Sequence, residues 1–480
     1  MTGDYLLPAR WEALGVARPK NRGGGEVAEG SSFAQVSEFV LRRPAGAFPD
    51  QVLEAASVLF LDTLGVTIGA ALMDAGRIAR DVAAKLYGAG NDGRAARIMF
   101  DGRRVSLAGA AFAAATQTDN LDGHDGYSPT KGHMGVVVVP TVAALAEGLP
   151  ALTGPEALAL IVVGYEIAGR AGIALHATVS DYHTSGAWNA LGVAAMAARA
   201  RGQSDDQLRQ ALGIAEYHGP RSQMMREIAH PTMLHDGSGW GALAGLSAAV
   251  LAEHGFAGAP AVTVEAPEVA RHWQDVGSFW QVLHQYIKPY PVCRWAHAAI
   301  DATRALCAAN GLTAEQIAHV HVNSFHHATA LFPGMPDTTS KAQYSLPFAV
   351  ATMIVHGGIG LDHISGAGLA DPAIAKVLKR ISVAESERHT GRFPEGRWAD
   401  VLIRTTDGRT LESGDVHARG GPEAPMSRED VLAKYRDFAT PVLGEERSNA
   451  IRDKILGLTA PNSRFADLAV LLYDIPQAGA

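Results

Sequence analysis

The chain has 480 residues, of which 47% are hydrophobic and 19% charged, so the composition is that of a globular protein and the length predicts two or more domains. The net charge of −8 and the absence of a long basic run argue against a nucleic-acid partner. The only cysteines, Cys293 and Cys307, exclude a disulfide framework and are too few to ligate an iron–sulfur cluster. They fit a reducing cytoplasm.

The N-terminal part of the chain is predicted to precede the folded core. Met1–Gly30 has no apolar run after a basic start and so does not resemble a signal peptide. Asn21–Gly30 is rich in glycine. We therefore expect residues 1–32 to form a mobile lead-in. Later apolar stretches are broken by Gly, His or charge before about 18 positions, so no membrane span is expected.

From about Val36 to about Gly258 the pattern is helical. Apolar residues recur at helical spacing within Gln51–Ala71. Further helices are predicted over apolar segments that Gly and Pro punctuate: Val136–Leu149, with Pro140 at its start, Ala157–Ala174, Gly186–Ala200 and Gly241–Glu253. Only two short runs alternate with period two, Ala96–Phe100 and Arg104–Leu107.

The pattern changes near Ile287. Strands are predicted by alternating runs over Ile317–Val322, Lys379–Ala384 and Trp398–Thr405. Asp407-Gly408 follows the last run and precedes Thr410–Glu412, which predicts a hairpin. Helices are expected between the strands, over Ala296–Asn310 and Ser345–His356.

The tail returns to helix over Ser427–Leu456 and Phe465–Leu472, and Ser427 is a plausible helix start. We therefore predict a mostly α protein with two domains. A large all-helical domain would span residues 33–286 and be completed by the C-terminal helices in residues 417–480. A smaller α+β lid domain would span residues 287–416.

The first group of candidate catalytic or binding residues along the chain is the segment Asp119–Asp125 together with His133. Three carboxylates and two histidines fall within fifteen residues of a glycine-punctuated loop between helices. Such a loop can aim polar side chains into a cleft, although a solvated turn with capping aspartates has the same composition. Metal binding is a rival use of these residues, but no HExxH or comparable spacing is present.

Two further polar segments directly precede predicted helices. Asp181–Gly186 brings His183 and two hydroxyls to a helix N-terminus, where free N–H groups favour an anion; ordinary N-capping by Thr184 or Ser185 is the alternative. His230–Gly241 is rich in glycine, which permits close backbone approach to a ligand. A tight packing turn would look the same.

The change of domain falls in Lys288–His297, a proline-fixed loop that carries Lys, Arg and His. Cations between two domains are suited to hold a carboxylate, and a linker with a salt bridge is the alternative. No Walker loop and no GxSxG motif is present, and Gly358-Ile359-Gly360 lacks the context of a dinucleotide site. Phosphoryl transfer, serine hydrolysis and hydride transfer are therefore disfavoured.

Taken in order, these segments resemble the MmgE/PrpD family, which includes 2-methylcitrate dehydratase, cis-aconitate decarboxylase and iminodisuccinate epimerase. The similarity runs from about Ser37 to about Leu456. The matching pieces are Leu61–Gly65, Asp119–Asp125 with His133, Gly164–Glu166, His183–Gly186, Asp236–Ala242, Lys288–His297, Tyr344–Phe348 and His417–Glu423. The resemblance implies a helical domain and an α+β lid domain with the active site between them, usually in a homodimer.

Family positions carry over residue by residue. Asp119 falls where the family has an active-site Asp, His133 and His183 match two active-site histidines, and Lys288 matches the lysine of the interdomain loop. His297 matches a histidine nine residues after that lysine.

Three positions depart from the family pattern. His235 stands where many members have an active-site lysine, Cys293 stands where the decarboxylase has a histidine, and Gly123 replaces a threonine after Asp122. The His-Pro-Ser version of the His133 region found in the dehydratase is also absent. The Asp-Gly-His form of the first loop is more similar to epimerase-like or unassigned members.

The reactions of the family share one demand: a proton must leave or join a carbon beside carboxylates. We therefore predict a cofactor-independent, dehydratase-like lyase for a small di- or tricarboxylate, with no metal. An epimerase of an iminodisuccinate-like compound and a non-catalytic carboxylate-binding relative are the alternatives. The expected catalytic residues are Asp119, His133, His183 and Lys288, and the expected substrate-binding residues are Asp122, His124, His235, Cys293, Arg294 and His297. His133 and His183 are expected to be the acid–base pair, with Asp119 orienting them or acting as base. Lys288 and Arg294 are expected to hold carboxylates, with His235 as a further candidate.

Overall fold

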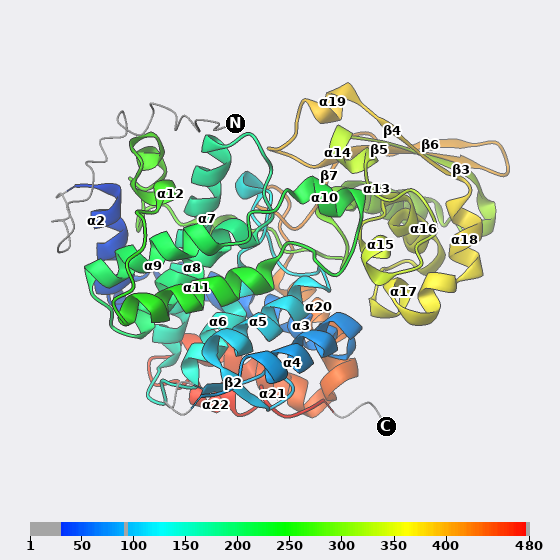
Figure 1. Ribbon diagram of the computed structural model, residues 1–480. Coiled ribbons are helices and arrows are strands. Elements are labelled where there is room, and N and C mark those ends of the chain that lie inside the picture. The colour runs from blue at the N-terminus through cyan, green and yellow to red at the C-terminus, as the bar shows by residue number, and fades with distance from the viewer. Residues whose placement is uncertain (1–29, 91–94, 477–480) are drawn as a thin grey trace, which may run out of the picture.

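The computed structural model describes residues 30–90 and 95–476 (Figure 1). Most of the predicted lead-in, residues 1–29, lies outside the described residues. The fold is mostly helical, with a large helical domain and a smaller α+β domain beside it (Figure 1), which confirms the predicted fold class.

The helical domain is built around apolar helices rich in small residues. α7 (Gly154–Thr178) and α8 (Gly186–Ala200) pack against each other, and nearly all of their side chains are buried. The same domain also contains α2 (Ser32–Ser37), α3 (Asp50–Gly69), α4 (Asp74–Leu86), α5 (Leu107–Asp119), α6 (Gly135–Ala146), α9 (Asp205–His218), α11 (Ser238–Glu253) and α12 (Val262–Glu265). The two predicted alternating runs form a short antiparallel pair, β1 (Ala95–Arg97) and β2 (Arg104–Ser106).

Glycine lets α7 and α8 approach closely. A Cβ added at Gly192 of α8 would lie 2.6 Å from the carbonyl oxygen of Gly164 in α7. We expect Gly192→Ala to lower the free energy of unfolding by about 1–3 kcal/mol, because this overpacking outweighs the better helix propensity of alanine. Denaturant unfolding measures the change. Gly148→Ala is the control, because its Cβ would meet nothing nearer than 3.7 Å; equal stability of the two variants would contradict the packing argument.

The prediction that Pro140 starts its helix is wrong. α6 begins at Gly135, and Pro140 lies inside it. The N–H groups of Val137 and Val138 both donate to the Met134 oxygen, at 3.1 and 3.2 Å, and so secure the turn before the proline. Every side chain from Gly135 to Leu145 is buried, so packing holds the helix despite the missing proline donor.

Two helical segments are longer and more apolar than predicted. Asp50–Leu72 and Gly154–Thr178 could each cross a membrane by length and composition alone. In the structure 83% and 94% of their most apolar windows are buried inside the protein, as in the core helices of globular folds.

The α+β domain is a small mixed sheet covered by helices. Its strand order is β4-β3-β5-β6, from β3 (Ile317–Ser324), β4 (Ile381–Glu385), β5 (Trp398–Thr405) and β6 (Thr410–Glu412). β3 pairs parallel with β4 and antiparallel with β5, and β7 (Val416–His417) also pairs with β5. The predicted Asp407-Gly408 turn joins β5 to β6, with Gly408 at φ 90°. α13 (His297–Asn310), α16 (Leu346–His356) and α18 (Pro372–Leu378) complete the domain, together with the short α14 (His326–Thr329), α15 (Thr339–Gln343), α17 (Leu361–Ile364) and α19 (Glu387–Thr390).

The C-terminal helices return to the helical domain, as the discontinuous fold predicts. α20 (Arg428–Leu443) and α21 (Glu445–Leu456) pack on α3, and α22 (Ala466–Ala469) follows them (Figure 1). The buried Lys434 of α20 donates to Asp62 Oδ1 of α3 at 2.6 Å and to the Gly123 oxygen at 2.7 Å. The tail therefore fixes the polar loop that follows α5.

Candidate active site

A narrow cavity with room for about 30 Å³ lies where the two domains meet. Its helical-domain wall comes from the loops before α6 and α8 and from α10 (Met224–Ala229). Its other wall comes from the interdomain loop and the α+β domain. The lining residues are Asp122, Lys131, His133, Tyr182, Met224, Ile228, Asp236, Tyr286, Lys288, Cys293, Arg294, Trp295, Tyr344 and Arg397.

Lys288 and Asp122 form a buried ion pair at the base of this cavity. Lys288 Nζ donates to Asp122 Oδ1 and also to the Asp122 backbone oxygen at 2.9 Å. The Lys288 side chain is 1% exposed. Burial works to lower the pKa of Lys288, but the Asp122 carboxylate outweighs it and the pKa is raised. The lysine is therefore a fixed positive charge, and its two bonds hold Asp122 in a left-handed conformation at φ 53°.

His133 presents one ring nitrogen as a proton acceptor. Its Nδ1 lies 2.6 Å from the Asp125 backbone oxygen. A carbonyl can only accept, so Nδ1 carries the proton and Nε2 has the lone pair. Nε2 lies 3.7 Å from Asp236 Oδ2 and makes no hydrogen bond within the described chain. Burial, and then Lys288, lower the pKa of His133. The imidazole is thus neutral near pH 7 and is suited to act as a base.

Asp236 is held by the turn before α8. Its Oδ1 accepts from the Ser185 N–H at 2.9 Å and the Ser185 hydroxyl at 2.8 Å, which leaves Oδ2 facing His133. The Ser185 Oγ in turn accepts from the His133 N–H at 2.9 Å. Ser185 therefore acts as a link between these two groups, and its side chain does not cap α8.

Two buried arginines of the cavity have no carboxylate partner in the described chain. Arg294 donates to the backbone oxygens of Ala418 and Arg419, and its Nε is buried without a partner. Arg397 is 3% exposed, and its Nε is likewise unpartnered. Burial lowers the pKa of Arg294 to about 10, which still leaves it charged at neutral pH. Unpaired buried charge is costly, so this wall is built to receive an anion.

Phenols and a thiol complete the lining as neutral groups. Burial raises the pKa of Tyr182 and of Tyr344 well above the usual range, and it also raises that of Tyr286. Burial raises the pKa of the Cys293 thiol to about 12, so Cys293 stands here as a thiol and not as a nucleophilic thiolate.

Asp119 and His235 face a different space, a wider groove on the other side of α10. Asp119 Oδ2 accepts from the Ser238 N–H at 3.0 Å and so binds the N-terminus of α11. Burial, reinforced by Asp236, raises the pKa of Asp119 well above its usual range. His235 has φ 46° and lies 3.5 Å from the Tyr344 hydroxyl, and burial lowers its pKa to about 4.

Besides His235, three more of the predicted histidines do not line the cavity. His124 is fully buried behind His133, with ring centroids 4.5 Å apart, and its Nε2 lies 3.9 Å from Asp119 Oδ1. His297 starts α13 and bonds the Val292 oxygen at 3.0 Å. The His183 backbone N–H donates to His176 Nε2, and burial and then Arg221 lower the pKa of His183. The structure therefore does not bring His183 together with His133 as an acid–base pair around this cavity.

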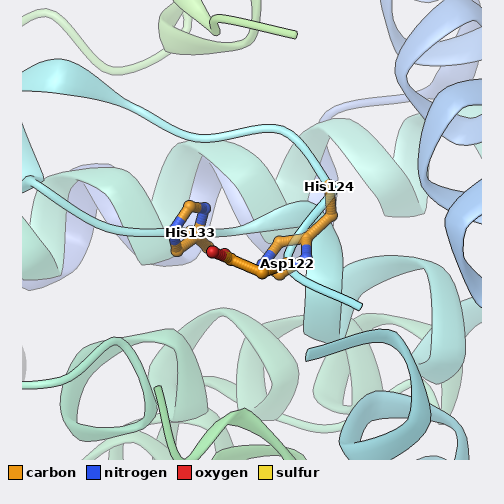
Figure 2. Close-up of side chains that lie close together, drawn as sticks. All are labelled: Asp122, His124 and His133. Carbon is orange, nitrogen blue, oxygen red and sulfur yellow. The ribbon is translucent and has the colours of Figure 1, made fainter. Parts of the chain in front are cut away.

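Asp122, His124 and His133 could by position share a metal ion, because their ligand atoms lie within 4.8 Å of one another; Figure 2 shows the three side chains together. The ammonium of Lys288 already occupies Asp122 Oδ1. A cation bound by the three residues would lie beside that fixed positive charge. The fixed charge of Lys288 disfavours a second cation here, although Asp122 Oδ2 and both ring nitrogens of His124 are buried without a hydrogen-bond partner.

Several cavity residues were not among the predicted site residues. Tyr182, Asp236 and Tyr344 lie in segments that the sequence singled out, so their motifs were available signals. Lys131, two residues before His133, has φ 54°, which a sequence pattern does not reveal. Arg397 comes from the residue before β5, and Tyr286 comes just before the interdomain loop; no motif marks either.

Fold and cavity together define a two-domain protein with a buried, cationic, proton-accepting site between its domains. The chain belongs to the MmgE/PrpD family: its N-terminal domain model matches residues 34–270 and its C-terminal domain model matches residues 290–458. Cis-aconitate decarboxylase of Aspergillus terreus is 25% identical over 416 residues, covering 77% of this chain and 80% of that protein. Cis-aconitate decarboxylase-like protein oryM of Aspergillus oryzae is 22% identical over 493 residues, covering 92% and 97%. These matches support a lyase that acts on a carboxylate.

Proposed function

We propose that this protein is a lyase that acts without a cofactor on a small di- or tricarboxylate, by moving a proton at a carbon next to a carboxylate. The family and the decarboxylase relatives support the lyase class and the carboxylate substrate. The proposal rests on the groups that line the cavity between the domains. A neutral imidazole with a free Nε2 shares one narrow cavity with a buried ammonium and two arginines that form no ion pair with a carboxylate of the described chain.

The chemistry follows from the positions of these groups. His133 Nε2 accepts the proton from the carbon, and the charge that develops on the neighbouring carboxylate faces Lys288. In a dehydration, the leaving hydroxyl takes a proton from a cavity donor, for which the phenols of Tyr286 and Tyr344 are placed. In a decarboxylation, carbon dioxide leaves first, the same cations stabilise the carbanion, and a cavity phenol then gives the carbon its proton and regains one from solvent. Both routes need carboxylates held in a dry cationic site.

The test is turnover followed by NMR in deuterated water, with cis-aconitate, 2-methylcitrate and iminodisuccinate as separate substrates. We expect loss of water or of carbon dioxide with at least one of them. Deuterium uptake into unchanged or epimerised compound, without either loss, would replace the lyase by an epimerase. Binding with no exchange at all would show a non-catalytic carboxylate-binding protein.

The state of His133 sets the pH profile. A base must be unprotonated, and the pKa of His133 is lowered from its ordinary value of 6.5. We therefore expect kcat/KM to be level above about pH 6.5 and to fall at lower pH as the imidazole takes up its proton. Initial rates across pH 4.5–8.5 (about four units) measure this. A rate that rises as the pH falls through that region would assign His133 the role of acid.

A further inference from the structure

The cavity holds two cations that form no ion pair with a carboxylate of the described chain and that come from different domains. Lys131 follows the short 3-10 turn Ser128–Thr130 in the helical domain, and Arg397 directly precedes β5 in the α+β domain. Both line the same narrow cavity. Neither makes an ion pair with an Asp or Glu anywhere in residues 30–90 and 95–476, whereas Lys288 beside them does.

Each cation is held in place by neutral groups. The Arg397 guanidinium donates through Nη1 to the Pro394 oxygen and lies over the Phe393 ring, 5.1 Å from its centroid. Lys131 Nζ lies 4.6 Å from the centroid of the Tyr182 ring, and the Tyr182 hydroxyl donates to the Lys131 oxygen. Lys131 also has φ 54°, a conformation that costs a lysine free energy. Two like charges are thus preorganised around the same space.

Such an arrangement is unfavourable without an anion. Burial and then the charge of Arg397 lower the pKa of Lys131, and burial lowers that of Arg397. Arg397 Nε is a buried donor with no acceptor. A carboxylate between the two side chains would accept from Nε and relieve the repulsion.

We infer that Lys131 and Arg397 form a carboxylate clamp that bridges the two domains and binds a second carboxylate of the substrate, distinct from the one beside Lys288 and His133. This assignment rests on the proposed function and narrows it. A compound with one carboxylate would leave the clamp empty and bind weakly. Because the two halves of the clamp belong to different domains, bound substrate also ties the α+β domain to the helical domain.

The experiment measures binding without turnover. Tricarballylate, a saturated tricarboxylate, is titrated calorimetrically into the wild type, Lys131→Met, Arg397→Met and the double variant. We expect each single variant to bind about 10- to 100-fold more weakly, from the loss of a charge-assisted hydrogen bond. Because both side chains hold one carboxylate, we expect the double variant to be only a few-fold weaker than the poorer single variant. Arg409→Gln, at an exposed ion pair with Asp407, is the control and keeps wild-type binding.

Three results would overturn the clamp. They are unchanged binding in both single variants, strictly multiplicative losses in the double variant, and wild-type protein that binds butyrate as tightly as tricarballylate. Turnover separates this inference from the proposed function. If the protein turns over a carboxylate and the Lys131 and Arg397 variants keep the wild-type KM, only the clamp is rejected. If these variants lose binding but the wild type has no lyase activity, only the proposed reaction is rejected.

Thermal unfolding without ligand distinguishes the clamp from a structural role. Removing an unpaired buried charge relieves repulsion, so we expect Arg397→Met to unfold at the wild-type temperature or above it. A purely structural arginine would give a lower unfolding temperature. If Arg397→Met does not fold, Arg397→Lys is the variant to measure, because it keeps the positive charge. The clamp predicts that Arg397→Lys binds more weakly than the wild type, with a raised KM and a near-normal kcat.

Discussion

His133→Gln is expected to lower kcat by about 10²- to 10⁴-fold, the contribution of a positioned general base, while leaving the fold intact. Glutamine keeps the size of the side chain and can still donate to the Asp125 oxygen, which accepts from Nδ1 in the wild type. It cannot take up a proton at the position of Nε2. The loss should therefore be in kcat, with KM changed little, and steady-state kinetics on the substrate identified by NMR measure it.

Two comparisons make the His133 result specific. His326→Gln changes a histidine that is 65% exposed and does not line the cavity, and it should retain full activity. The acid limb of the pH profile should also vanish in His133→Gln, because the titrating group is gone. Residual activity above a tenth of the wild type, with the acid limb preserved, would assign proton transfer to another residue. His183→Gln is then the variant to measure, since the family pattern places a histidine there.

The arrangement of elements could be predicted largely from the sequence because it depends on local periodicity. The helical spacing in Gln51–Ala71 and the alternation over Trp398–Thr405 each appear within a few residues, and both elements are present. Pro140 shows the limit of such reasoning. A proline favours a helix start in isolation, but burial on all sides of α6 keeps the helix continuous through it. That burial is a tertiary effect which no window of sequence contains.

The site was only partly predictable, for a related reason. Chemistry-bearing segments can be recognised one by one, and the structure does gather Asp122, His133 and Lys288 around one cavity. The direction of each side chain depends on neighbours distant in the chain. Asp119 lies three residues before Asp122, but its carboxylate binds the N-terminus of α11 and faces the other side of α10.

Arg397 illustrates what a motif search cannot find. It is a single arginine before a strand, with no neighbour in sequence that marks it as part of a site. Its significance arises from burial and from the absence of an acidic partner in the described chain. Both properties exist only once the α+β domain is packed against the helical domain.

Lys288→Met is expected to abolish measurable turnover and to lower the free energy of unfolding by about 3–5 kcal/mol, the usual result of removing one partner of a buried ion pair. The variant leaves the Asp122 carboxylate, 3% exposed, without its cation. It also removes the bond from Nζ to the Asp122 oxygen, which holds the left-handed turn. Denaturant unfolding and steady-state kinetics are measured on the same preparation.

The double variant Lys288→Met/Asp122→Asn separates the two effects. Asparagine removes the orphaned charge and tolerates the positive φ of this position, so much of the lost stability should return. Activity should not return, because no fixed positive charge faces the carboxylate on which the electrons collect. Recovered stability without recovered turnover assigns Lys288 to the chemistry of the cavity. Recovery of both would show that the lysine serves only to neutralise Asp122, and the charge stabilisation would then have to come from Arg294 and Arg397.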